Sequence, residues 1–213
     1  MVNLYLIRHA RQCIQLCNLD VELTIEGRKQ AKLLRDRIKN YDIDALYSSD
    51  LIRAKQTAEI INESFGLPHQ IRVGMREISF GLLEGHSDEY IKEHFADFVR
   101  EQKRLVEDIP FPGGENGQTV YERAMPVIKE IAQSGDKNIV IVTHGGVIRA
   151  LLGELFGKSQ AHRFLFAASL ENSSITQLVY EEKLDRFYLE RFNDCAHLEG
   201  YPQLSRRAIP GKG

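Results

Sequence analysis

The stretch VNLYLIRHA at residues 2–10 decides the fold class, together with a second stretch of the same design, NIVIVTHGG at 138–146. Each is a short apolar run, rich in branched residues, that ends in a histidine: His9 in the first and His144 in the second. Such runs are typical of buried strands in a parallel sheet. Ligands of open α/β sheets bind outside the carboxyl ends of the strands. We therefore expect both histidines in one crevice, although 135 positions separate them.

Around these two stretches, predicted strands and helices alternate along the chain. A helix at about 24–39 begins at the N-cap Thr24, a strand at 44–48 follows, and Ser49 or Asp50 caps a helix that stops at Gly66. After the second histidine we expect a helix at about 146–156 and strands near 174–180 and 186–192. This order favours an α/β fold: a three-layer α/β/α sandwich with a mostly parallel sheet.

Residues 68–116 break the alternation, because glycine and proline interrupt them repeatedly. A helical piece starting near Ser87 lies within this region, and we interpret about 82–116 as a small helical excursion over the active site. Pro126 should kink the next helix or mark its late start. We expect a single domain over 1–213 whose tail, about 199–213, is loose.

Composition excludes several classes of function. A net charge of −2 provides no global field for nucleic acid or an anionic membrane, and no apolar run is long enough to span a bilayer. The three cysteines, Cys13, Cys17 and Cys195, form no disulfide framework, which favours a reducing, cytoplasmic setting. The sequence is also compatible with a homodimer.

Charged side chains gather at the same predicted sheet edge as the histidines. Arg8 precedes His9, and Arg53 lies in the first turn of the helix after the second strand. Arginine forks and helix N-termini both suit phosphate oxygens. A histidine here could act as a nucleophile, and Glu77 is the candidate acid for the leaving oxygen, with Glu84 in reserve.

These residues resemble the histidine phosphatase superfamily, also called the phosphoglycerate mutase-like family. The similar segments are Arg8-His9-Ala10, Leu23–Ala31, Tyr47–Ala58, Glu77–Gly85, Pro112-Gly113-Gly114-Glu115, Val142–Gly146 and the ending Asn193-Asp194 with His197-Leu198. They follow one another in the family's order and cover nearly the whole chain.

The resemblance implies a role for each matching residue. His9 would be the nucleophile that becomes phosphohistidine, while Arg8, Arg53 and His144 would bind the phosphoryl oxygens. Glu77 would protonate the leaving alcohol and then activate water. The resemblance implies no metal and no organic cofactor.

The segment after His9 departs from the family pattern. Ala10 replaces the usual glycine, Arg11 replaces an acidic or neutral residue, and Gln15 stands about where a phosphate-binding asparagine is expected. We predict that Arg11 selects a substrate with a second negative group, with Glu84 also contributing to substrate selection. The alternative is that Arg11 points to solvent or pairs with a surface carboxylate.

The sequence therefore predicts a metal-independent phosphatase acting on a small-molecule phosphomonoester. A phosphoglycerate mutase is the first alternative, although mutases of this family carry a longer excursion. A non-catalytic phosphate-binding regulatory protein is the second. A metal site formed by His9, His144 and Glu77 is a weaker chemical alternative, since their spacing fits no metal-ligand pattern.

Overall fold

The computed structural model describes residues 1–14 and 16–206, and in this part of the chain six strands form one sheet. The strands are β1 (Val2–Arg8), β2 (Ala45–Ser48), β3 (His69–Ile71), β4 (Asn138–Thr143), β5 (Ile175–Glu181) and β6 (Arg186–Asp194). Their order is β3-β2-β4-β1-β5-β6. The first four strands in this order are parallel, while β5 and β6 form an antiparallel edge.

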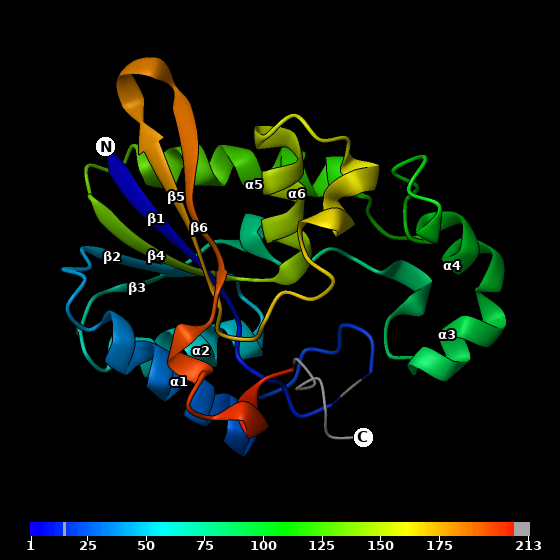
Figure 1. Cartoon of the computed structure of the whole chain (residues 1–213), viewed down its shortest axis with the longest axis horizontal. Helices are drawn as coiled ribbons and strands as arrows, with labels where there is room; N and C mark the ends of the chain where they lie inside the picture. Colours follow the sequence, from blue (N-terminus) through cyan, green and yellow to red (C-terminus); the bar gives the residue numbers. More distant parts are fainter. Residues whose placement is uncertain (15, 207–213) are drawn as a thin grey trace.

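Helices cover both faces of this sheet, which confirms the three-layer architecture. Helices α1 (Ile25–Ile38) and α2 (Ile52–Asn62) lie on one face, and α5 (Gly117–Ala132) and α6 (Gly145–Leu155) lie on the other (Figure 1). Side chains of β1 alternate between the two faces: Leu4 and Leu6 pack with α5 and α6, and Tyr5 and Ile7 pack with α1 and α2.

The excursion forms a separate lobe beside the sheet. It holds α3 (Asp88–His94), whose N-cap is Ser87, and α4 (Ala96–Lys103), both at the right of Figure 1. Short 3₁₀ turns connect the other elements, at Val73–Met75, Gly81–Leu83, Gln160–Phe166, Glu182–Leu184, Ala196–Leu198 and Pro202–Leu204. None of the helices in the described residues has the length and apolar character needed to cross a membrane.

The structure differs from the expected elements in three places: a strand that was not predicted, a helix cap that is wrong, and one of the two alternatives for Pro126, which is excluded. The edge strand β3 was missed, because three half-exposed residues carry no hydrophobic pattern. Helix α2 is capped by Leu51, with no side-chain cap, rather than by Ser49 or Asp50. Helix α5 begins at Gly117 with an Asn116 capping box, so Pro126 lies inside the helix and does not mark a late start.

The tail is packed rather than loose as far as it is described, and residues 207–213 lie outside that range. Leu204 is buried, and its carbonyl accepts hydrogen bonds from Gln30 (2.7 Å) and Arg11 (2.8 Å). The Glu171 carboxylate accepts bonds from the Ser205 hydroxyl and the Arg206 backbone N–H. Such side chain-to-backbone bonds leave no periodic trace in a sequence.

Candidate active site

The strand register brings the two histidines together. In the parallel pair β1·β4, Arg8 lies opposite Thr143, so the next residue in each strand, His9 and His144, leaves the sheet at the same edge. The His9 N–H donates to the Thr143 carbonyl (2.9 Å), and the two imidazole centroids are 5.1 Å apart. The two histidines therefore lie side by side at this edge, as predicted, and His9 lines the crevice while His144 is fully buried beside it.

The His9 ring is buried and held in one orientation. Its Nδ1 lies 2.8 Å from the Ala10 carbonyl oxygen, which can only accept, so Nδ1 carries the proton and Nε2 carries the lone pair. Burial, reinforced by the charges of Arg53 and Arg8, holds the pKa of His9 well below the ordinary 6.5. His9 is therefore neutral at neutral pH and can act as a nucleophile through Nε2.

His144 is buried on the other side of the crevice, at the N-terminus of α6. Its Nε2 lies 2.7 Å from the Ser49 hydroxyl, which in turn accepts a bond from the Leu51 N–H. Ser49 can therefore donate to Nε2, which leaves the proton of His144 on Nδ1. Burial, followed by the charges of His9 and Arg53, keeps the pKa of His144 well below 6.5.

Two arginines add positive charge beside the histidines: Arg8, which is half-buried, and Arg53, which is buried. Arg8 donates to the Leu170 carbonyl, and Arg53 donates to the Leu19 carbonyl (3.0 Å) and the Asn18 amide oxygen (2.7 Å). Within the described residues, Arg8 Nε, Arg53 Nε and His144 Nδ1 are buried without a hydrogen-bond partner. Three donors without partners, on residues close to His9, suit the oxygens of a phosphoryl group.

Glu77 lies close to these two arginines. Its Oε1 accepts from the Gly146 N–H at the start of α6 (2.9 Å) and from the Ile78 N–H (3.0 Å). Gly146 is required here, because a Cβ at this position would lie 2.4 Å from that oxygen. The two bonds fix the carboxylate at the helix N-terminus, where it faces the crevice.

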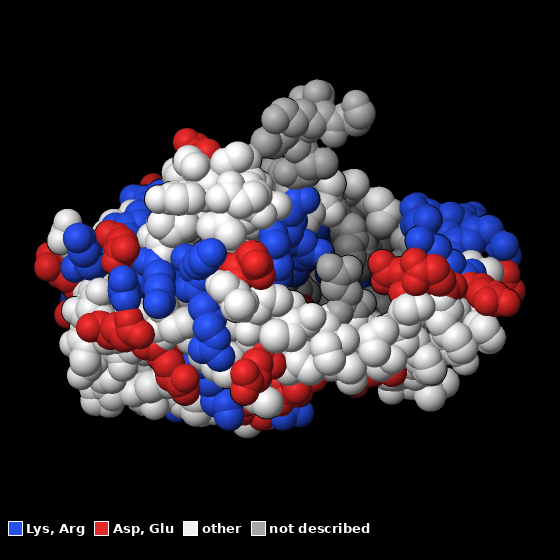
Figure 2. Space-filling view, turned by 90° about the horizontal axis from the view of Figure 1, so that it is seen from below, with Lys and Arg blue, Asp and Glu red and all other residues white. Residues whose placement is uncertain are grey.

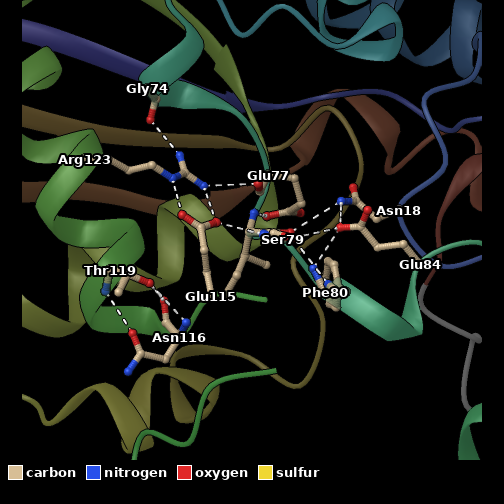
Figure 3. Close-up of polar contacts among 12 residues, drawn as sticks. Asn18, Gly74, Glu77, Ser79, Phe80, Glu84, Glu115, Asn116, Thr119 and Arg123 are labelled. Atoms are coloured by element: carbon tan, nitrogen blue, oxygen red, sulfur yellow. Dashed lines mark hydrogen bonds and ion pairs between the residues drawn. The ribbon is translucent and has the colours of Figure 1, made fainter. Parts of the chain in front are cut away.

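Two further residues, Arg123 and Glu115, hold the loop that carries Glu77 (Figure 3). Arg123 of α5 donates to the backbone carbonyls of Gly74 (2.8 Å) and Glu77 (3.1 Å). Arg123 also pairs with Glu115, whose second oxygen accepts from the Ser79 N–H (2.8 Å). Glu115, the last residue of the Pro-Gly-Gly-Glu segment, therefore helps to position the loop that carries Glu77.

Glu84 also acts on the loops, which corrects its expected role in substrate selection. Its Oε1 accepts from the Phe80 N–H (2.9 Å), the Ser79 hydroxyl (3.2 Å) and the Asn18 amide (3.0 Å). Figure 3 shows these contacts converging on one carboxylate oxygen. Glu84 thus orients Asn18, which binds Arg53.

Arg11 lies in the wall of the crevice, and the tail engages one nitrogen of its guanidinium, so its contact with a second anion stays a prediction. Its Nη2 donates to the carbonyls of Leu204 (2.8 Å) and Ser205 (3.5 Å). Ala10 is buried and does not adopt a positive φ, so the glycine of the family pattern is not needed there. Gln15, the expected phosphate-binding residue, lies outside the described residues.

The crevice is a cavity of about 700 Å³ whose walls include Arg8, His9, Arg53 and Glu77. Residues of the excursion close one side, among them Ile91, Phe98 and Gln102. Figure 2 shows the surface hollowed between the main body and the α3–α4 lobe, with charges of both signs interspersed over this face. In the described residues, no three His, Cys, Asp or Glu side chains lie close enough to hold a metal ion.

Sequence reasoning missed several residues of the site. Asn172 donates to the His9 carbonyl (2.9 Å), and Ser49 and Asn18 orient His144 and Arg53. These residues lie in loops, where no periodicity marks them. Arg149 lines a neighbouring cavity, and it could have been found because it lies one helical turn after Gly145.

Comparison with known proteins adds an independent finding. A family model described as "Histidine phosphatase superfamily (branch 1)" matches residues 4–195. A Hydrogenobacter thermophilus relative named "Putative phosphoserine phosphatase 2" is 31% identical over 90% of this chain and 96% of its own. A "Probable phosphoglycerate mutase GpmB" of Salmonella choleraesuis is 30% identical over 93% of this chain and 96% of its own.

The solved structures agree with these sequence matches. A mycobacterial glucosyl-3-phosphoglycerate phosphatase in complex with inorganic phosphate superposes with a TM-score of 0.82 and 27% identity. The match covers 92% of this chain and 99% of the mycobacterial chain.

Proposed function

Because the chain belongs to the histidine phosphatase superfamily, we propose that it is a phosphatase that hydrolyses a small-molecule phosphomonoester through a phosphohistidine at His9. One observation carries the proposal. A neutral His9 presents Nε2 to a crevice where two arginines and a second histidine hold unpartnered N–H groups. The phosphatases among the relatives support the same reaction class.

In the first step, the Nε2 lone pair of His9 attacks phosphorus, and the bond from phosphorus to the alcohol oxygen breaks. Arg8, Arg53 and His144 donate to the phosphoryl oxygens as charge shifts onto them. Glu77 supplies the proton that the leaving alkoxide needs. In the second step, Glu77 takes a proton from water, the water oxygen bonds to phosphorus, and the P–N bond breaks to release inorganic phosphate.

A phosphoglycerate mutase is the second candidate, and the Salmonella relative favours it. The two reactions share the first step, since both begin by phosphorylating the histidine. They differ in the acceptor: a mutase returns the phosphoryl group to a hydroxyl of a bound phosphoglycerate, whereas a phosphatase transfers it to water.

Turnover of nitrophenyl phosphate in the presence of EDTA tests the proposal. We expect hydrolysis that survives the chelator, and loss of hydrolysis in a folded His9→Ala variant. Isomerisation of phosphoglycerate that depends on a bisphosphate primer would favour the mutase. Phosphate binding without any turnover would identify a non-catalytic binding protein, and loss of turnover with EDTA would contradict a metal-independent reaction.

A further inference from the structure

A second cavity of about 300 Å³ adjoins the crevice on the Glu77 side. The two cavities are adjacent, because six residues line both of them: Arg8, Glu77, Phe80, Phe111, Phe164 and Arg206. Arg149 and Arg163 line only the smaller one. In the proposed reaction the leaving oxygen lies beside Glu77, which borders both cavities, so the second cavity can take the alcohol portion of the substrate.

Arg149 is the unusual residue of the second cavity. Its Nη2 donates to the Ala167 carbonyl (2.8 Å), while its Nε is buried and has no hydrogen-bond partner in the described part of the chain. No carboxylate of the described residues forms an ion pair with it. Its guanidinium lies 5.9 Å from the Phe164 ring centroid, which leaves it at the cavity wall.

Among the other charged groups around the cavity, Glu77 is a carboxylate held by backbone N–H groups and not by a cation, and the remaining carboxylates have partners of their own. Arg163 is buried against Asp108, whose oxygens also accept from the Gly117 and Gln118 N–H groups. The carboxylate of Glu171 is held by Ser205 and by the backbone of Asn172 and Arg206. Burial lowers the pKa of Arg149. The charge of Glu77 opposes this shift, and the charges of Arg163 and Arg206 add to it.

A guanidinium that is largely withdrawn from water and lacks a counter-charge is costly for the protein unless a ligand pairs with it. We infer that Arg149 binds a second anionic group, a carboxylate or a further phosphate, on the alcohol portion of the substrate. This inference rests on the proposed function for the position of the phosphoryl group. It assigns to Arg149 the role that the sequence had suggested for Arg11.

Binding of matched phosphonates tests the inference separately from turnover. Calorimetry compares a carboxyalkylphosphonate with the alkylphosphonate of the same chain length, and then an alkylene bisphosphonate of that length. If Arg149 forms a charge-assisted hydrogen bond, the wild type should bind at least one of the two compounds with a charged tail about 10- to 100-fold more tightly than the plain alkylphosphonate. Whichever compound gains affinity identifies the second group as carboxylate or phosphate.

The Arg149→Gln variant should lose this preference, with both compounds binding within about threefold of each other. Arg149→Lys should keep part of this preference, because the positive charge remains while the planar guanidinium with its paired donors is lost. Plain alkylphosphonate affinity should not change, which shows that the variants are folded. Arg100→Gln, on exposed α4, controls for a change of one charge and should behave as the wild type.

Equal affinity of the wild type for charged and uncharged tails, at every chain length tried, would overturn the inference. So would a preference that survives Arg149→Gln. Neither result depends on catalysis. If the phosphonates bind with the expected preference but nitrophenyl phosphate is not hydrolysed, the second anion site stands and the proposed phosphatase activity fails.

Discussion

The imidazole of His9 is prepared for reaction by its own neighbour in the chain. The Ala10 carbonyl fixes the proton on Nδ1, and burial, together with the charges of two arginines, lowers the pKa of the ring and keeps it uncharged. The sequence predicted the residues of this arrangement, because strand ends are positions that a pattern of apolar residues defines. It did not predict the tautomer or the contacts of Asn18 and Ser49, which depend on loop geometry.

Replacement of Glu77 by glutamine separates proton transfer from positioning. The amide oxygen of Glu77→Gln can still accept from Gly146 and Ile78, so the loop should keep its shape. We expect kcat/KM to fall about 10²- to 10⁴-fold on glycerol phosphate, whose alkoxide needs a proton. The loss on nitrophenyl phosphate should be much smaller, and equal losses on both substrates would assign Glu77 a structural role.

Replacement of Arg11 separates its contacts with the tail from its predicted contact with a second anion. Arg11→Gln removes the hydrogen bonds to the Leu204 and Ser205 carbonyls, and it should lower the free energy of unfolding by about 1 kcal/mol. Its relative activity on substrates with and without a second anion should match the wild type. A selective loss on the doubly charged substrate would support the predicted contact of Arg11. Arg28→Gln, on the exposed side of α1, is the control.

At the scale of elements, the positions of the strands and helices were largely predictable, since long apolar periodicities survive tertiary packing. How closely the elements pack against one another was less predictable. Gly27 shows this: a Cβ there would lie 2.1 Å from the Arg11 carbonyl oxygen. The glycine lets α1 pack against the loop after β1, where Gln30 accepts the Arg11 N–H (2.8 Å). The motif was recognisable, whereas its physical reason required the structure.

The N-terminus of α6 provides a similar test at Gly146. The methyl group of Gly146→Ala would clash with Glu77 Oε1 (2.4 Å) and the Ile78 side chain (2.7 Å), so the carboxylate must move. We expect a loss of at least about tenfold on glycerol phosphate and a smaller loss on nitrophenyl phosphate, the signature of a displaced acid. Gly200→Ala, where a Cβ meets nothing within 4 Å, should be neutral. A fully active Gly146→Ala would contradict this account of Glu77.

At the scale of the whole molecule, the tail closes the fold onto the site. Leu204 is held by Gln30 and Arg11, and Arg206 reaches the walls of both cavities. Residues from the loop after the first strand, the first helix and the last described turn therefore meet at one place. A sequence without a pattern in its final residues could not predict that meeting.

Buried histidines make the stability of the molecule depend on pH. Burial, with a further contribution from Arg37, lowers the pKa of His197 to about 4, below the 6.5 of an unfolded chain. The unfolded state therefore binds the proton more tightly, and the stabilisation is present above pH 6.5 and is lost as the pH falls toward about 4. The full loss from this group is about 3 kcal/mol.

Urea unfolding of His197→Gln and wild type across this range measures the effect. The difference in free energy of unfolding between the two proteins should shrink as the pH falls from 6.5 toward about 4. His162→Gln, at an exposed position, should follow the wild type at every pH. A constant difference between His197→Gln and wild type would show that protonation of His197 is not linked to unfolding.

The most direct test of the central claim is to trap the phosphoryl group on the enzyme. The wild type is mixed with a labelled phosphomonoester, quenched in alkali after a short time, digested and sequenced by mass spectrometry. The account predicts a phosphate that is stable in base, labile in acid and located on His9, and it predicts none in His9→Ala. Two results would contradict the account: turnover with neither an initial burst nor a phosphorylated histidine, and a phosphate located on another residue.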